Sequence, residues 1–547
     1  MVDRFLRSRI HRANGFAAWA AACGLGLAAA FPAGGFVVVS PSDGWFRTDT
    51  GSVSNQPSVQ RLRYQAATPV PAPSPSMRFA LGVALLLGAG FALRVKAREG
   101  DRMAHRRHRW WLAGFLLAAA LPLSSQARVY QTSAVVLEGD SLPFAGGPAA
   151  AGGILPGFYA STAGKIAFTA FPEGAPLEQS VFRATGGNIE AIASPGDPAP
   201  GTGGAVFGYL FGLGVDADGD VLFYANDCAG PCYEGLFLST PTGVVPVVLT
   251  GEAAPGTGGG SFSGLDFGSA AFDGAGGVAF EASVSGGSTG GGVFLASGGQ
   301  IAPIALEGDA APGGAGDSFF GFLGRVGVNA AGRVVFSALL DASNGPSGVF
   351  LHEPGGLRAV ALTGEPAPGG GTFSNFANDT WIDASGDVVF SASVVGAANA
   401  GIFQDSDGSL RAVARAGQPA PGVGGVFHEV LDPAQRGAEV AFIGTVEDPL
   451  AVGLFSERDG TLELVTRSGV SAPGTGGSFH SVGVPRPGPP GALFFYGVVA
   501  DGESGGGIFR AREVPAVPAL GGAGLGVVAA ALAGSALVRF RRRLPRP

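Results

Sequence analysis

The sequence predicts an all-β fold, a seven-bladed β-propeller. Three observations predict it: a repeat of about 55 residues, four strand-like segments in each repeat, and two partial repeats that complete one another. Each repeat opens on a Gly followed by Ala-Pro-Gly or a degenerate version of it. The openings start at Gly139, Gly196, Gly251, Gly308, Gly364, Gly417 and Gly469, at intervals of 52 to 57 residues. A fixed period of this length is typical of an array of supersecondary units rather than of an enzyme with a single core.

The first strand-like segment follows a turn in which Asp or Asn lies three residues before a Gly, as in Asp216 and Gly219. The short polar side chain bonds the nearby backbone, and the Gly accepts a positive φ. A β-branched residue and a Phe then begin a buried strand. The turn recurs at Asp273, Asn329 and Asp383. We therefore expect a structural Asx-turn at each of these positions.

Three further segments recur in the same order. The second is a short strand of the Gly-Val-Phe type, as at Phe350, and the third is an alternating run, as at residues 357–362. The fourth surrounds the Phe after the Gly-rich run, as at Phe373. Four short strands with no helical stretch between them fit one propeller blade. We expect the Ala-Pro-Gly segment to form the turn from the third strand to the fourth in each blade, so that its copies lie on one face.

The two ends of the repeat region predict how the ring closes. The first clear unit opens at the third segment, residues 134–138, and the last stops after the second segment, residues 507–509. Together they make one whole blade with strands from both ends of the region, and a closed ring leaves few exposed sheet edges. The alternative is a β-solenoid, but solenoid rungs are usually shorter and the stack needs caps.

The charge is distributed unevenly along the chain. The first 127 residues carry 15 of the 34 Lys and Arg and 5 of the 42 Asp and Glu, which leaves 19 basic and 37 acidic residues for the remainder. An acidic body of this kind repels nucleic acid, so we expect no nucleic-acid partner. The 95 Gly and 39 Pro are many, but the strict period and the buried-type Phe argue against disorder.

Residues 103–127 have the pattern of a secretory signal peptide. A basic stretch precedes a short apolar core, and Ser125 and Ala127 occupy the −3 and −1 positions of a cleavage site, which predicts cleavage after Ala127. Residues 1–102 contain two weak apolar segments, 15–39 and 79–93, neither of which is a confident membrane span. Either translation begins at Met103, or the first 102 residues are a separate unit joined in the gene model, and in both cases this extension is absent from the mature protein. The alternative is a genuine membrane-anchored extension. The propeller itself is predicted over residues 128–513.

Residues 514–547 form a predicted membrane-anchor tail. An apolar run of about 20 residues precedes a cluster of arginines, and this length suffices to cross a bilayer as a hydrophobic helix. Terminal arginines favour the cytoplasmic side, which places the propeller outside the membrane.

Tail and repeats each resemble a known family. The tail resembles the tripartite sorting tails of the PEP-CTERM and IPTL-CTERM class of Gram-negative bacteria, although Pro-Glu-Pro itself is absent. The residues that carry this likeness are Val517, Pro518, Ala519, Leu520, Gly521 and Gly522, with Arg541, Arg542 and Arg543 after the span. The repeats resemble those of "choice-of-anchor" proteins with the NxxGxxAF tandem repeat, matched by Asn329, Gly332 and Phe336. The resemblance implies export, recognition by an exosortase-type sorting protease, and display or release at the cell surface.

Two groups of residues are candidates for special chemistry. Cys228 and Cys232 lie in one loop, and in an exported protein such a pair favours a small disulfide over a metal site, since no second Cys pair or His cluster accompanies it. Asp216, Asp218 and Asp220 resemble part of a calcium loop but lack its distal Glu, so a structural turn is the better interpretation and Ca²⁺ is a weaker alternative. We expect no cofactor.

The sequence contains neither the metal-binding His-Glu-x-x-His motif nor the phosphate-binding Gly-Lys-Ser/Thr motif. In the repeat region His352, His428 and His480 lie in different repeats without matched partners. Near-identical repeats also predict no asymmetric polar cluster. We therefore expect a non-enzymatic surface protein with a structural, adhesion or matrix-binding role, with exopolysaccharide as a possible ligand. The competing hypothesis is a hydrolase or lyase of extracellular glycan, which needs acids or His converging on the central channel.

Overall fold

The computed structural model describes residues 128–514, apart from 228–231, 267, 315, 341–345, 378 and 397–398, and also the two short strands β1 (Ala29–Ala30) and β2 (Phe36–Val37), which pair with each other. The chain divides into two units, Met1–Ala118 and Ala119–Pro547, and the following concerns the second. The predicted signal peptide with Ala127 and the sorting tail from residue 515 lie outside the described residues, as does the extension 1–102 apart from β1 and β2. None of the described residues belongs to a helix long and apolar enough to cross a membrane.

The described part of the second unit consists of seven antiparallel sheets, which we number as blades in chain order. Blade 1 contains β4 (Ser141–Phe144), β5 (Gly147–Ile154), β6 (Tyr159–Ala160), β7 (Ile166–Pro172), β8 (Ser180–Thr185) and β9 (Asn188–Ala193). Blade 2 contains β10 (Tyr209–Val215), β11 (Val221–Asp227), β12 (Tyr233–Thr240) and β13 (Gly243–Leu249). Blade 3 contains β14 (Ser261–Leu265), β15 (Ala271–Phe272), β16 (Val278–Ser285), β17 (Gly291–Ser297) and β18 (Gln300–Leu306).

The remaining four blades continue the same order. Blade 4 contains β19 (Gly321–Val328), β20 (Val334–Leu339), β21 (Ser347–Glu353) and β22 (Gly356–Leu362). Blade 5 contains β23 (Thr372–Phe376), β24 (Trp381–Ile382), β25 (Val388–Val395), β26 (Ala400–Ser406) and β27 (Ser409–Arg415). Blade 6 contains β28 (Phe427–Arg436), β29 (Glu439–Glu447), β30 (Leu450–Arg458) and β31 (Thr461–Arg467). Blade 7 contains β32 (Ser478–Pro487), β33 (Ala492–Ala500), β34 (Gly506–Val514) and β3 (Val129–Leu137).

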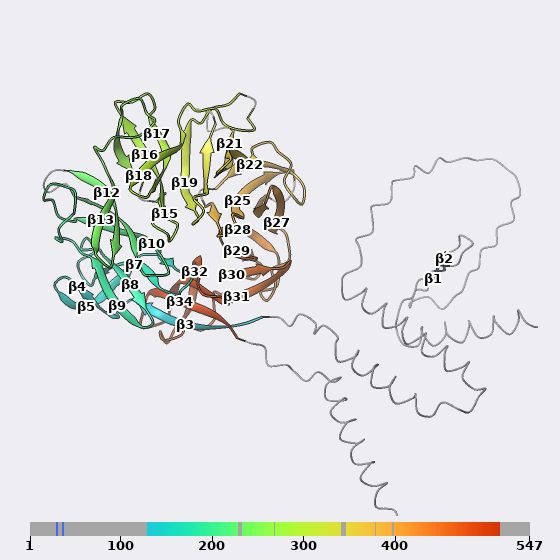
Figure 1. The fold of residues 1–547 in the computed structure, drawn as a ribbon. Helices are drawn as coiled ribbons and strands as arrows, with labels where there is room; N and C mark the ends of the chain where they lie inside the picture. Colours follow the sequence, from blue (N-terminus) through green and yellow to red (C-terminus); the bar gives the residue numbers. More distant parts are fainter. Residues whose placement is uncertain are drawn as a thin grey trace, which may run out of the picture. The chain divides into compact units, whose positions relative to one another are not determined.

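The blades surround a central axis, so the predicted seven-bladed propeller is confirmed (Figure 1). In each blade the inner strand is the fourth segment of the sequence repeat, and the first, second and third segments follow it outward. Blades 1, 3 and 5 have an inner strand in two pieces, of which the second is β6, β15 or β24.

Blade 7 closes the ring with strands from both ends of the repeat region, as predicted. The strand order is β3-β34-β33-β32, so β3 forms the outer edge of a sheet whose other strands come from the end of the region. Val136 pairs with Ile508, and both are fully buried. This pairing excludes the solenoid alternative, because a solenoid does not bring its first and last strands into one sheet.

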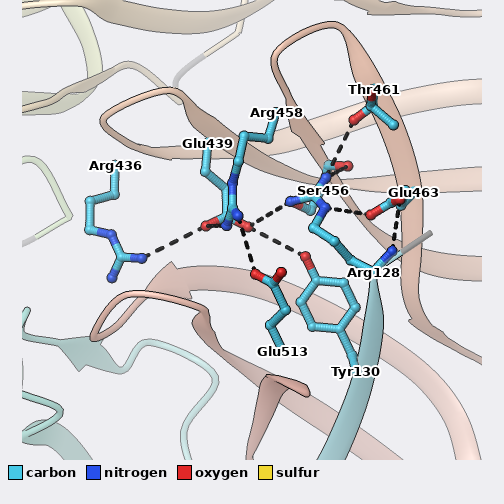
Figure 2. Close-up of polar contacts among 9 residues, drawn as sticks. All are labelled: Arg128, Tyr130, Arg436, Glu439, Ser456, Arg458, Thr461, Glu463 and Glu513. Atoms are coloured by element: carbon cyan, nitrogen blue, oxygen red, sulfur yellow. Dashed lines mark hydrogen bonds and ion pairs between the residues drawn. The ribbon is translucent and has the colours of Figure 1, made fainter. Parts of the chain in front are cut away.

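A network of polar side chains fastens the closing strand to blade 6 (Figure 2). We call it the closure network, and its members are Arg128, Tyr130, Arg436, Glu439, Ser456, Arg458, Thr461, Glu463 and Glu513. At its centre the carboxylate of Glu439, 5% exposed, lies 2.9 Å from Arg458, 3.5 Å from Arg128 and 3.7 Å from Arg436. The hydroxyl of Ser456 donates to the same carboxylate at 2.8 Å. The network therefore joins β3 to strands of the neighbouring blade by charge as well as by packing.

The Ala-Pro-Gly segment has a different position from the one expected. It connects the outer strand of one blade to the inner strand of the next, as residues 250–260 connect β13 to β14, and these strands belong to different sheets. The segment folds back on itself: Ala254 N donates to Gly260 O at 2.9 Å, and Phe262 N donates to Glu252 O at 2.9 Å. Gly256 has a φ of +76° there. The sequence period did not show which junction between strands separates two blades.

All the Ala-Pro-Gly loops nevertheless lie on one face, as predicted, because successive strands alternate in direction. Counted outward from the axis, the second and third strands of each blade are also connected on that face, as β11 is to β12 in blade 2. We call it the loop face. The Asx-turns lie on the opposite face, and Asp216 Oδ1 there accepts hydrogen bonds from Gly219 N at 2.6 Å and Asp220 N at 2.8 Å. In the same way, Oδ1 of Asp273, of Asn329 and of Asp383 accepts a hydrogen bond from the backbone N–H four residues later.

Three phenylalanines form the core of each of blades 2 to 7. In blade 4 the ring of Phe319 meets that of Phe350 edge-on at 4.9 Å, and Phe336 stacks on Phe350 at 5.7 Å. Blade 1 keeps the stacked pair Phe168 and Phe182 and takes its edge-on ring from Phe144. The Phe positions that recur in the sequence are therefore the contacts that hold each blade together.

Candidate functional site

Four side chains from four blades meet at the propeller axis. They are Tyr159 of β6, Arg325 of β19, Trp381 of β24 and Arg486 of β32, and we call them the axial cluster. The Arg325 guanidinium lies 5.1 Å from the centre of the Tyr159 ring and 5.9 Å from that of Trp381. Arg486 lies 5.2 Å and 5.6 Å from the same two rings. Since blades 1 and 4 are on opposite sides of a seven-membered ring, these contacts span the axis.

The register of the inner strands explains why these side chains reach the axis. Tyr159 pairs with Ala167, Trp381 with Val389 and Arg486 with Phe494, so all three occupy the same position in their blades. In the other four blades this position holds a small residue: Gly214, Ala271, Gly327 and Ala434. Small residues at this position in four blades leave room at the axis for Tyr159, Trp381 and Arg486 and also for Arg325, which lies two residues before Gly327 in blade 4.

Two carboxylates accompany the axial cluster. Asp379 accepts hydrogen bonds from Ser391 Oγ at 2.6 and 2.7 Å and from Asp432 N at 3.1 Å. Burial raises the pKa of Asp379 to about 6 and also raises the pKa of Asp432. Burial, with the nearby charge of Arg325, lowers the pKa of Arg486 to about 9. The expectation of no asymmetric polar cluster is therefore wrong, because the inner strands differ between blades at positions that the repeat comparison did not align.

We expect Asp379→Asn to stabilise the protein at pH 7 by about 1–3 kcal/mol. The folded-state pKa of Asp379, about 6, lies above its ordinary value of 3.8. The folded protein thus binds this proton more tightly than the unfolded chain, and the carboxylate lowers stability as the pH rises from about 4 to 6. Guanidinium unfolding at pH 4, 5, 6 and 7 measures this, with the exposed Asp218→Asn as control. Equal pH dependence in wild type and Asp379→Asn would contradict it.

A separate pocket of about 880 Å³ opens on the loop face between blades 5 and 6. Its polar lining comes from Asn399, Arg415, Gln418, His428, Glu447 and Asp448. Arg415 is the last residue of β27, His428 the second residue of β28 and Glu447 the last residue of β29, and the other three lie in the adjoining loops. We call this cavity the loop-face pocket. Its volume is in the range of small-molecule sites.

Arg415 brings a positive charge to the loop-face pocket, where it replaces a leucine of the repeat. It lies opposite Gly401 in the register of β26 and β27, a position that is leucine in four other blades: Leu137, Leu249, Leu306 and Leu362. Its guanidinium donates to Pro368 O at 2.6 Å and to Gly370 O at 3.2 Å, and it lies 5.5 Å from the centre of the Phe403 ring. Burial lowers the pKa of Arg415. A position-by-position comparison of the repeats would have picked out Arg415 together with Arg467, its counterpart in blade 6.

His428 has a partner that the sequence did not indicate. Its Nδ1 lies 3.1 Å from Glu447 Oε1, and the two side chains are 61% and 72% exposed. The residues are brought together because β28 and β29 are paired neighbours in blade 6. An imidazole beside a carboxylate can bind a polar ligand or exchange a proton with it.

The structure describes only some of the other predicted site residues. Cys232 is disulfide-bonded, and its predicted partner Cys228 lies outside the described residues, so the pairing of these two stays a prediction. Asp216 uses its carboxylate within the Asx-turn described above. Within the described ranges, no group of three or more His, Cys, Asp and Glu is placed to hold a metal ion.

The closed ring, the side chains that meet at its axis and the loop-face pocket together define an asymmetric seven-bladed β-propeller. The chain belongs to DUF7453, a family of unknown function, whose profile matches residues 126–347 and 342–509. No curated protein matches the chain.

Several solved structures are similar to this chain at low identity. A protein of unknown function from Dyadobacter fermentans is 13% identical with a TM-score of 0.30, over 71% of this chain and 99% of that one. A PL25 ulvan lyase is 11% identical with a TM-score of 0.35, over 71% and 96%. The Dos1 propeller is 14% identical with a TM-score of 0.33, over 69% and 82%. At these scores the blade count rests on the strand pairing of this chain and not on the likenesses.

Proposed function

We propose that this chain is an exported bacterial surface protein whose propeller is a binding module, and that the loop-face pocket takes a unit of a neutral extracellular polysaccharide. The observation that carries the proposal is the replacement of a repeat leucine by Arg415 in a pocket of about 880 Å³. Export, sorting by the tail and membrane attachment belong to the same proposal and are supported by the sequence patterns of residues 103–127 and 514–547.

The lining of the loop-face pocket suits a ligand that is rich in hydroxyl groups. Asn399 and Gln418 each carry a donor and an acceptor, Arg415 offers donors only, and Glu447 offers acceptors only. A sugar ring presents alternating donors and acceptors to such a mixed set, and the volume admits one or two rings.

The charge of the protein favours a neutral saccharide over an acidic one. After residue 127 the chain has 37 acidic and 19 basic residues. A surface with this balance repels a polyanion at a distance, and the single buried guanidinium of Arg415 does not reverse that field. A neutral polymer meets no such barrier.

The test compares two substitutions at the same register position in neighbouring blades. Arg415→Leu places the repeat residue in blade 5, and Arg467→Leu makes the same change in blade 6, away from the loop-face pocket. We expect Arg415→Leu to weaken binding of the full-length protein to immobilised polysaccharide from the producing cells roughly 10- to 100-fold. Its stability should be unchanged or slightly higher, because the other blades pack leucine there.

Two outcomes would count against the proposal. Equal binding by wild type, Arg415→Leu and Arg467→Leu would exclude the loop-face pocket as the binding site. Release of new reducing ends or unsaturated sugars by the wild type would favour the hydrolase or lyase instead. In that case His428→Ala, compared with His480→Ala at the equivalent position of blade 7, would test the His428 and Glu447 pair as its acid–base group.

A further inference from the structure

The main-chain nitrogen of Arg128 is held by a carboxylate. Arg128 N donates to Glu463 Oε1 at 2.9 Å, and the Nε of the same residue donates to Glu463 Oε2 at 2.5 Å. The side chains of Arg128 and Glu463 are only 12% and 11% exposed. One carboxylate thus binds both the backbone and the side chain of the residue that immediately precedes β3 (Figure 2).

The predicted signal cleavage after Ala127 would make Arg128 the first residue of the mature protein. A signal peptidase hydrolyses the bond between the Ala127 carbonyl and Arg128 N, so that Ala127 keeps the new carboxylate and Arg128 gains a free amine. This amine has an ordinary pKa of about 7.7–8.0, so it is largely protonated at neutral pH. The donor beside Glu463 would then be a cation instead of a neutral amide.

We propose that Arg128 is the mature N-terminus and that its α-ammonium is a member of the closure network, so that removal of the leader completes the fastening of the ring. An ammonium on a partly buried carboxylate makes a stronger hydrogen bond than an amide does. The closing strand β3 is the element that gains, because Arg128 adjoins it. This inference rests on export, which the proposed function includes, but not on the loop-face pocket.

The charged and polar side chains around Arg128 and Glu463 come from six strands. Glu463 is on β31, Glu439 on β29, Arg458 and Ser456 on β30, Arg436 at the end of β28, and Glu513 and Tyr130 on β34 and β3. Arg128 and Arg436 already share Glu439 with Arg458. Of the three carboxylates, Glu463 is the one that contacts the Arg128 main chain.

The pairing of the α-ammonium with Glu463 predicts how the stability of the folded protein changes with pH. The ion pair raises the pKa of the α-ammonium in the folded protein above its unfolded value. Its contribution is therefore fully present below about pH 8 and is lost as the pH rises through the folded-state pKa. An extended chain with an amide at Arg128 has no such titration.

The first experiment is N-terminal sequencing of the protein recovered from the producing cells, and the expected first residue is Arg128. The second compares guanidinium unfolding of this protein with that of a form that keeps Gln126 and Ala127, from pH 6 to pH 10. At pH 6 to 7 we expect the unfolding equilibrium constant of the Arg128 form to be roughly fivefold smaller, with the difference fading toward pH 10. Glu463→Gln should abolish the difference, whereas the exposed Glu178→Gln should preserve it.

The outcomes separate the parts of the inference. A start at Met1 or Met103 would show an uncleaved leader and would contradict the export in the proposed function, whereas any other start upstream of residue 128 would overturn Arg128 as the mature N-terminus. A start at Arg128 with equal stability of both forms at every pH would leave export intact and overturn the role of the α-ammonium. A difference that persists in Glu463→Gln would place that role elsewhere than Glu463 and would also overturn the proposal.

Discussion

Replacing Glu439 by alanine is expected to lower the free energy of unfolding by about 3–5 kcal/mol, because three partly buried guanidiniums lose the buried carboxylate that they share. The Glu439 carboxylate lies within 4 Å of Arg128, Arg436 and Arg458. Without it, Arg128 still pairs with Glu463 and Arg458 with Glu513, but Arg436 loses its ion pair and the three guanidiniums lose the carboxylate that lies between them. Burial already lowers the pKa of Arg436, which shows that its charged form is disfavoured there.

The effect of Glu439→Ala should be concentrated on ring closure. The same carboxylate accepts hydrogen bonds from Ser456 and from Tyr130 of the closing strand, and burial raises the pKa of Tyr130, so its hydroxyl keeps its proton and remains a donor. Amide hydrogen exchange should therefore rise first in β3 and β34.

Guanidinium unfolding of the full-length protein measures the loss, with the exposed Glu178→Gln as the control that removes a carboxylate without a network. Glu439→Gln separates charge from hydrogen bonding, since it keeps the acceptor but not the charge, and we expect an intermediate loss. A Glu439→Ala protein as stable as wild type would show that the closure network does not hold the ring.

Replacing Phe350 by alanine is expected to cost about 3–5 kcal/mol through the cavity it leaves. The Phe350 ring is fully buried and contacts two other aromatic rings of its blade, Phe319 edge-on and Phe336 in a stack. Because the interior is close-packed, the surrounding strands cannot collapse into the space without breaking their own pairing.

The sequence offers a matched control for Phe350→Ala in the same blade. Phe320 follows Phe319 but is 51% exposed, so Phe320→Ala should change stability by no more than about 0.5 kcal/mol. The midpoint of guanidinium unfolding distinguishes the two variants. A similar loss for both would mean that the recurring Phe positions do not form the core.

The blade is the part of the fold that the sequence predicted best. A strand such as β20 follows from an Asx-turn at Asn329, a run of β-branched residues and Phe336, all within ten positions of one another. Repetition of this local signal seven times also predicted the ring and its closure by β3. The junction at the Ala-Pro-Gly segment was assigned wrongly, because a loop between blades and a turn within a blade have the same local composition.

The functional candidates were much less accessible from the sequence. Tyr159 and Arg325 are on opposite sides of the ring and meet only because the inner strands of all blades face one axis. His428 and Glu447 meet through strand pairing, and Arg415 is exceptional only when its position is compared with that of Leu362 in the preceding blade.

Period, strand content, number of blades and closure thus follow from residues close together in the chain, since turns, strand propensity and alternation are local properties. The axial cluster, the loop-face pocket and the closure network depend on contacts between residues far apart in the sequence. Arg128 and Glu463 are brought together by the closing of the ring, and no local pattern records which side chains then meet. Only the tertiary structure decides where side chains that differ between the repeats come together into a cluster or pocket, because these contacts are made between blades.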